Sequence, residues 1–76
     1  MNMVVILMGN WLKIYRIKLN LSQAKVASMA RITTQHYNYI ENGSRRPSPQ
    51  VAKRIAEALG FKDEWYRLLE AVVDSA

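Results

Sequence analysis

Several kinds of residue are scarce in this chain of 76 amino acids, and each scarcity excludes a class of function. Cysteine is absent, which excludes disulfide bonds and thiolate metal sites. The single histidine, His36, has no second histidine and no cysteine with which to build a metal cluster or a nucleophile–base pair. The three glycines form no phosphate-binding loop. We therefore expect no enzymatic activity, no metal and no cofactor.

Long apolar runs are also missing. The run near the start, Met3–Met8, is far shorter than the ~20 residues that a transmembrane helix needs. No basic residue precedes this run and no cleavage-site pattern follows it, so it does not fit a signal peptide. We expect a cytoplasmic protein that has no membrane partner.

Acidic residues are rare in one part of the chain. The net charge is +5, and between Lys13 and Arg54 nine lysines and arginines accompany one acid, Glu41. From Ala56 onward five acids accompany only two basic residues. A basic segment of this kind favours a polyanionic partner. A soluble basic surface without a partner would have the same composition.

The stretch around Gln23 to Gly43 predicts two short helices joined by a tight corner. The first helix is expected at Ser22–Met29 and the corner at Ala30–Ile32. Thr33 is a suitable N-cap for the second helix, because its hydroxyl can accept a bond from a free backbone N–H. Gly43 ends that helix, since glycine adopts the left-handed conformation readily.

The second of these helices has an apolar side and a polar side. Tyr37 and Ile40 lie three residues apart and are expected to face the core. The outward side then carries Thr34, Gln35, Asn38 and Tyr39. Hydrogen-bonding groups on the outside of a short helix are what the reading of base edges in a major groove requires. The alternative is an ordinary solvated face.

The two helices, the corner between them and the segments named at the end of this paragraph occur in the order and spacing of a known family. With them the chain resembles the Xre/Cro helix-turn-helix proteins, which include phage repressors. The resemblance covers roughly Gly9 to Leu69. It departs from the family at Arg31, where the family often has glycine. A left-handed arginine there would cost on the order of 1 kcal/mol. The matching segments are Leu21-Ser22-Gln23, Val26-Ala27, Ala30, Ile32-Thr33, Ile40-Glu41-Asn42-Gly43, Arg46-Pro47-Ser48 and Ala58-Leu59-Gly60.

The resemblance implies an all-α fold, a compact orthogonal five-helix bundle like the lambda-repressor DNA-binding domain, over residues 9–76. An apolar N-terminal arm, residues 1–8, would precede it as a strand, an extended segment or a disordered extension. The first helix is expected at Asn10–Lys18, the fourth between Ser48 and Gly60, and the fifth from Lys62 or Asp63. The expected buried residues are Leu12, Tyr15 and Leu19 in the first helix, Val51, Ile55, Ala58 and Leu59 in the fourth, and Phe61, Trp65, Leu68, Leu69 and Val72 in the fifth.

The resemblance also implies a partner, double-stranded DNA, and residue roles. Bases would be contacted by Thr34, Gln35, Asn38 and Tyr39, although Tyr39 could instead reach a phosphate or cover the bundle. Phosphates would be contacted by Gln23, Thr33, Asn42, Arg45 and Arg46. Arg16 and Glu41 would form a structural ion pair, because an arginine can meet a carboxylate with two parallel bonds.

The function that follows is a sequence-specific DNA-binding transcriptional regulator, expected to be a repressor that binds a palindromic operator as a homodimer. It would be nucleoid-associated when bound, and no small-molecule ligand is evident. Surplus apolar residues, Val4–Leu7, Trp11, Ile14, Val72 and Val73, suggest an interface. We expect pairing through the fifth helix and nearby first-helix residues, or through the arm. The alternative function is a protein-interaction module, such as an antitoxin or antagonist component.

Overall fold

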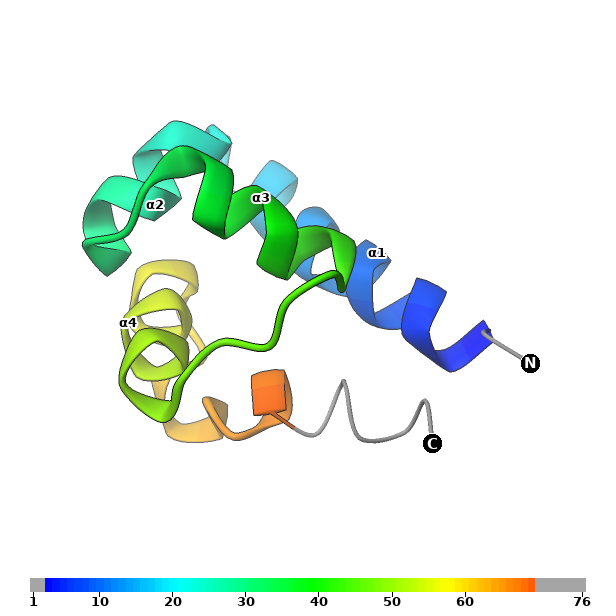
Figure 1. Ribbon diagram of the computed structural model, residues 1–76. Helices are drawn as coiled ribbons and strands as arrows, with labels where there is room; N and C mark the ends of the chain where they lie inside the picture. Colours follow the sequence, from blue (N-terminus) through cyan, green and yellow to red (C-terminus); the bar gives the residue numbers. More distant parts are fainter. Residues whose placement is uncertain (1–2, 70–76) are drawn as a thin grey trace.

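Four α-helices and one short 3₁₀-helix make up the part of the chain that the computed structural model describes (Figure 1). It describes the backbone of residues 3–69 and the side chains of residues 11–69. The elements are α1 (Met3–Lys18), α2 (Gln23–Ala30), α3 (Thr34–Asn42), α4 (Pro49–Leu59) and the 3₁₀-helix η1 (Lys62–Glu64). The backbone of residues 3–69 contains no strand, so the predicted all-α class is confirmed.

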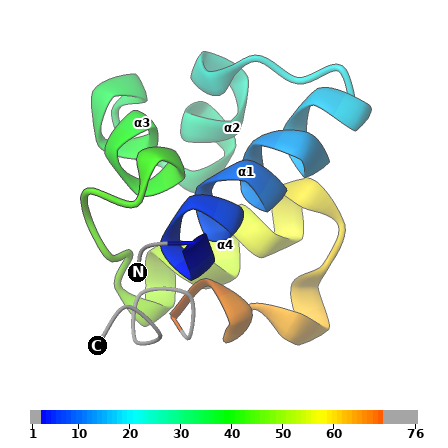
Figure 2. The same cartoon turned by 90° about the vertical axis from the view of Figure 1, so that its right-hand side faces the viewer.

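The helices pack around α4 and α2. α2 packs against both α3 and α4, α1 packs against α3, and η1 packs against α4. In both views α2 and α3 lie at one end of the bundle, and the segment after α4 lies at the other (Figures 1 and 2). No helix within residues 3–69 is long and apolar enough to cross a membrane.

Hydroxyl side chains cap the start of three helices. Ser22, Thr33 and Ser48 have extended backbone, and each accepts a bond from the backbone N–H three residues later, at 3.0, 3.0 and 3.2 Å. A cap of this kind stabilises a helix by ~1 kcal/mol relative to alanine. α2 therefore begins at Gln23 and ends at Ala30, one residue later at each end than the sequence predicted.

Left-handed residues end the helices and turn the chain. Asn20 follows α1 with a φ of 59°, and Arg31 follows α2 with a φ of 62°. Gly43 and Gly60 end α3 and α4 with φ values of 81° and 89°. The corner between α2 and α3 thus places a non-glycine residue in the left-handed region, as the departure at Arg31 suggested.

The core is built mainly from α2, α3 and α4, with Leu12 of α1 and Phe61 and Leu68 after α4. Small residues on the facing sides of α2 and α4 let the two helices approach closely, and Tyr37, Ile55 and Val26 are the largest fully buried side chains. The buried apolar set is Leu12, Val26, Ala27, Ala30, Tyr37, Ile40, Ala52, Ile55, Ala56, Leu59, Phe61 and Leu68.

Two predictions about the first helix were wrong. Its start was expected near Asn10, but α1 begins at Met3 and runs through Gly9. A helix that has formed its first turns extends at little cost, so the β-branched run before Gly9 joins it. Leu19 was expected to be buried but is 49% exposed, because α1 ends at Lys18 and helical spacing no longer applies. The boundary of a separate arm at residue 8 stays a prediction.

The faces predicted for the later helices need smaller corrections. In α4, Ile55 and Leu59 are buried as expected, but Val51 and Ala58 are only half-buried, since Ala52 and Ala56 occupy the centre of the inner face. The fifth helix begins as η1, and helical backbone resumes at residues 67–69. Phe61 and Leu68 are buried, Trp65 and Leu69 are half-buried, and Val72 lies outside the described residues.

An aromatic cluster fastens the segment after α4 to α1. Trp11, Tyr15 and Phe61 meet edge to face, with ring centroids 5.1 to 5.3 Å apart. The Arg67 guanidinium lies 4.7 Å from the centre of the Trp11 ring. Trp11 is thereby covered from within the chain, whereas Ile14 and Ile17 of α1 are 49% and 53% exposed.

Candidate nucleic-acid interface

The corner between α2 and α3 holds the two helices in a fixed relation. The backbone N–H of Ile32 donates to the carbonyl of Ala27 at 3.0 Å, which closes the end of α2. Thr33 then caps α3 through its hydroxyl. Val26 and Ala30 of α2 and Tyr37 of α3 are fully buried, so the contact between the helices is dry and the outer side of α3 is presented to solvent.

Polar side chains line that outer side of α3. Thr34, Gln35 and Asn42 are exposed, Tyr39 is 37% exposed, and Asn38 is half-buried. Their spacing of three and four residues places them on neighbouring turns of one helix surface. The structure therefore brings together the residues for which the sequence predicted base contacts.

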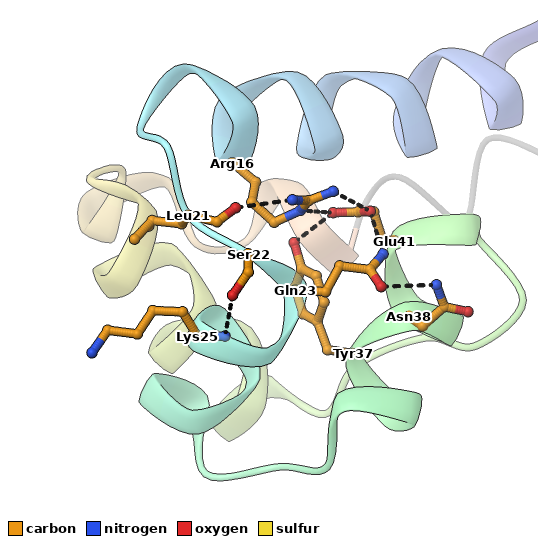
Figure 3. Close-up of polar contacts among 8 residues, drawn as sticks. All are labelled: Arg16, Leu21, Ser22, Gln23, Lys25, Tyr37, Asn38 and Glu41. Atoms are coloured by element: carbon orange, nitrogen blue, oxygen red, sulfur yellow. Dashed lines mark hydrogen bonds and ion pairs between the residues drawn. The ribbon is translucent and has the colours of Figure 1, made fainter.

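A buried carboxylate anchors this helix to the two before it. Glu41 is 4% exposed and accepts four hydrogen bonds (Figure 3). Arg16 of α1 donates from Nε to Oε2 at 2.8 Å and from Nη2 to Oε1 at 3.2 Å. Tyr37 donates to Oε2 at 2.8 Å, and Gln23 of α2 donates from Nε2 to Oε1 at 2.7 Å. The ion pair expected between Arg16 and Glu41 forms here, and it joins α1, α2 and α3.

The charges of this cluster stabilise one another. Burial alone would raise the pKa of Glu41, but the hydrogen bonds from Arg16, Gln23 and Tyr37 outweigh it and hold that pKa below its ordinary value. The hydrogen bond to Glu41 likewise raises the pKa of Arg16. Burial and the bond to Glu41 raise the pKa of Tyr37, which keeps its phenol protonated as a donor. Glu41 is therefore a fixed negative charge inside the bundle.

A chain of side-chain amides leads from this charge to the outer side of α3. Gln23 accepts at Oε1 from Nδ2 of Asn38, at 3.2 Å (Figure 3). Asn38 accepts at Oδ1 from Nδ2 of Asn42, at 3.1 Å. We call Glu41, Gln23, Asn38 and Asn42 the amide relay. Its first member is buried, and its last is exposed.

A second set of contacts ties the remaining polar residues together. Gln35 donates from Nε2 to the hydroxyl of Tyr39 at 2.8 Å. The guanidinium of Arg45 lies 5.8 Å from the centre of the Tyr39 ring, within the range of a cation–π contact. Arg46 is exposed in the loop that follows α3. Gln35, Tyr39 and Arg45 therefore already contact one another in the free protein.

The sequence of the chain matches known proteins over the region that contains these helices. Residues 12–66 match the model of the helix-turn-helix family. The chain belongs to this family, in its Xre-like branch. A Bacillus subtilis (strain 168) protein named as the uncharacterised HTH-type transcriptional regulator YqaF is 42% identical over 66 residues, which are 87% of this chain and 84% of that protein. No solved structure matches the chain.

In this Xre-like protein the helix-turn-helix unit is α2, the Arg31 corner and α3. Sequence reasoning placed Glu41 with Arg16 but missed two further partners of the carboxylate, Gln23 and Tyr37. For Tyr37 a signal was available, because it precedes Glu41 by four residues on the same helix. For Gln23 there was none, since its contacts cross between helices.

The residues predicted to contact phosphate have different surroundings. Gln23 is engaged within the amide relay, and the hydroxyl of Thr33 is engaged in capping α3. Asn42, Arg45 and Arg46 are exposed at the end of α3 and in the loop beyond it. Their phosphate contacts stay predictions. Among the described residues no group of three histidines, cysteines or acids could hold a metal ion.

Proposed function

We propose that this protein is a sequence-specific DNA-binding transcriptional regulator, and specifically a repressor, whose α3 reads base edges in the major groove. The observation that supports it most is the polar outer side of α3. This helix is fixed to α1 and α2 by buried Glu41, which accepts four hydrogen bonds. A short helix with amide and hydroxyl groups outward matches the donor and acceptor pattern of major-groove base edges. The name of the Bacillus subtilis relative, a transcriptional regulator, agrees with this proposal.

The proposed base contacts come from the first two turns of α3. Thr34 and Gln35 lie at its start, where a recognition helix of this motif enters the groove. Asn38 and Tyr39 lie one turn later. Glutamine and asparagine can each bond adenine at N6 and N7, and a threonine methyl can touch the methyl group of thymine.

The proposed phosphate contacts lie around those residues. Arg45 and Arg46 follow α3 in an exposed loop, with Asn42 at the last turn of the helix. Thr33 and Gln23 lie at the starts of α3 and α2, where backbone N–H groups favour an anion. Contacts of this kind orient the protein on the duplex and carry no sequence information themselves.

We further propose that the protein binds a palindromic operator as a homodimer. One helix-turn-helix unit reads few base pairs, and two units on half-sites about 34 Å apart multiply the discrimination. Ile14 and Ile17 leave apolar surface on α1. Val4–Leu7, Val72 and Val73, predicted to share in pairing, lie outside the described side chains. Sedimentation of the DNA-free protein at high micromolar concentration should give the dimer mass; a monomer mass would contradict a pre-formed dimer.

A second candidate function is a protein-interaction module, for which the exposed Ile14 and Ile17 would be the contact surface. The salt dependence of binding distinguishes the two functions. Binding driven by phosphate contacts weakens steeply as salt rises, whereas apolar contact does not.

The experiment that tests the main proposal is the selection of bound sequences from a random DNA pool. If a consensus emerges, Gln35→Ala should weaken binding to it by roughly 1–3 kcal/mol, the value of a bidentate base contact. Binding to scrambled DNA should barely change, because phosphate contacts supply it. Equal losses on both DNAs would remove Gln35 from base reading.

Arg46→Ala tests the backbone contacts in the same assay. Binding should weaken on all sequences, and the slope of log affinity against log salt concentration should become shallower by about 1. Lys62→Ala, which also removes one positive charge but lies in η1 at the other end of the bundle, is the matched control. An unchanged slope in Arg46→Ala would place this arginine away from DNA.

A further inference from the structure

The amide relay has a direction, because each amide has one donor end and one acceptor end. Ionised Glu41 can only accept hydrogen bonds, so Gln23 must turn its NH₂ group toward the carboxylate. The carbonyl of Gln23 then faces Asn38, which must donate a hydrogen bond to it from its own NH₂ group. The carbonyl of Asn38 in turn faces the NH₂ group of Asn42.

Reversing any one amide would break this order. If Gln23 were flipped, its carbonyl oxygen would lie against a carboxylate oxygen with no proton between them, and the NH₂ groups of Gln23 and Asn38 would oppose each other. The buried charge of Glu41 cannot be relieved by protonation near neutral pH, because its pKa lies below the ordinary value. The orientation of the Asn38 and Asn42 amides is therefore set from inside the bundle.

The relay leaves Asn38 with a defined pair of free groups. An asparagine side chain has two donor protons and two acceptor lone pairs. One proton is engaged by Gln23 and one lone pair by Asn42, so one donor and one acceptor remain. One donor toward N7 and one acceptor toward the N6 amino group is the arrangement that recognises adenine in the major groove.

We propose that Gln23, held by Glu41, is a positioning residue that fixes the amide of Asn38 for reading one adenine in each half-site. The inference rests on the proposed function, and it assigns Gln23 a role in sequence preference beyond a phosphate contact. A phosphate contact alone would make Gln23 contribute equally on every DNA sequence. Because of the relay, Gln23 contributes to sequence preference only through the base pair that Asn38 contacts.

The test compares sequence preference in the wild type, Asn38→Ala, Gln23→Met and the double variant, each selected against a random DNA pool. Methionine keeps the length of Gln23 but removes both polar ends. We expect Asn38→Ala and Gln23→Met to relax the preference at the same base pair, by about tenfold, and the double variant to relax it no further than Asn38→Ala alone. Gln50→Met, the same chemical change at an exposed site in α4, should leave the preference unchanged.

A second measurement needs no DNA and also checks folding. The side-chain amide resonances of Asn38 in the nuclear magnetic resonance spectrum should move in Gln23→Met and stay in place in Gln50→Met. Unmoved resonances would overturn the relay as an orienting device in the free protein.

The outcomes separate this inference from the proposed function. A wild-type protein that selects no sequence overturns both. The positioning role alone is overturned if the wild type selects a consensus but Gln23→Met weakens binding to all sequences equally. It is also overturned if Gln23→Met changes the preference at a different base pair from Asn38→Ala.

Discussion

Replacing Arg16 by methionine should destabilise the protein strongly, although Arg16 is not one of the proposed base contacts. The side chains of Arg16 and Glu41 are 12% and 4% exposed, so the pair behaves as a buried one. Removing one partner of such a pair costs ~3–5 kcal/mol, because the other charge stays buried without compensation. Arg16 supplies two of the four hydrogen bonds to Glu41, and Gln23 and Tyr37 would remain. We therefore expect a loss of about 3 kcal/mol in the free energy of unfolding.

The assay is urea unfolding followed by far-ultraviolet circular dichroism, together with the melting temperature. For a domain of this size a loss of about 3 kcal/mol corresponds to a fall of about 12 °C or more. Glu64→Gln is the control, since its ion pair with Arg67 is exposed on both sides and contributes less than about 1 kcal/mol. An Arg16→Met loss no larger than that of Glu64→Gln would refute the buried-anchor reasoning.

Two further predictions concern pH and the corner. Because the folded pKa of Glu41 is depressed, its contribution to stability is present above the ordinary value of 4.5 and is lost as pH falls through the folded pKa. The free energy of unfolding should thus decline below about pH 5 in the wild type, and more shallowly in Glu41→Gln; parallel declines would contradict this account. Arg31→Gly should stabilise the protein by up to about 1 kcal/mol in the same urea assay, since glycine adopts a φ of 62° without strain. A destabilised Arg31→Gly protein would show that the arginine side chain has a stabilising role at the corner.

The parts of the fold that could be predicted from the sequence are those set by neighbouring residues. Thr33 and Ser48 cap helices through bonds to N–H groups three residues away, and Gly43 ends α3 through its own backbone freedom. Ser22 caps α2 in the same way, although the sequence predicted it as the first residue of that helix. Such chemistry is visible in a short window of sequence. The inward positions of Tyr37 and Ile40 followed from helical spacing in the same way.

The parts that could not be predicted depend on contacts between distant segments. The Arg16–Glu41 pair, 25 residues apart, was expected only because the chain resembles a known family. The links from Gln23 to Glu41 and Asn38 span 18 and 15 residues, and no local pattern marks them. The start of α1 was missed for a different reason, since β-branched residues weakly oppose a helix that cooperative extension favours.

The two tryptophans, Trp11 in the aromatic cluster and Trp65 beside Lys53, are optical reporters of one end of the bundle. Trp11 meets Phe61 edge to face and the Arg67 guanidinium lies over the Trp11 ring, and the Lys53 ammonium lies 4.8 Å from the centre of the Trp65 ring. Both indoles lie where the segment after α4 meets α1 and α4, whereas α2 and α3 contain no tryptophan. Intrinsic tryptophan emission should therefore follow the undocking of residues 61–69 and change little when a ligand occupies the outer side of α3.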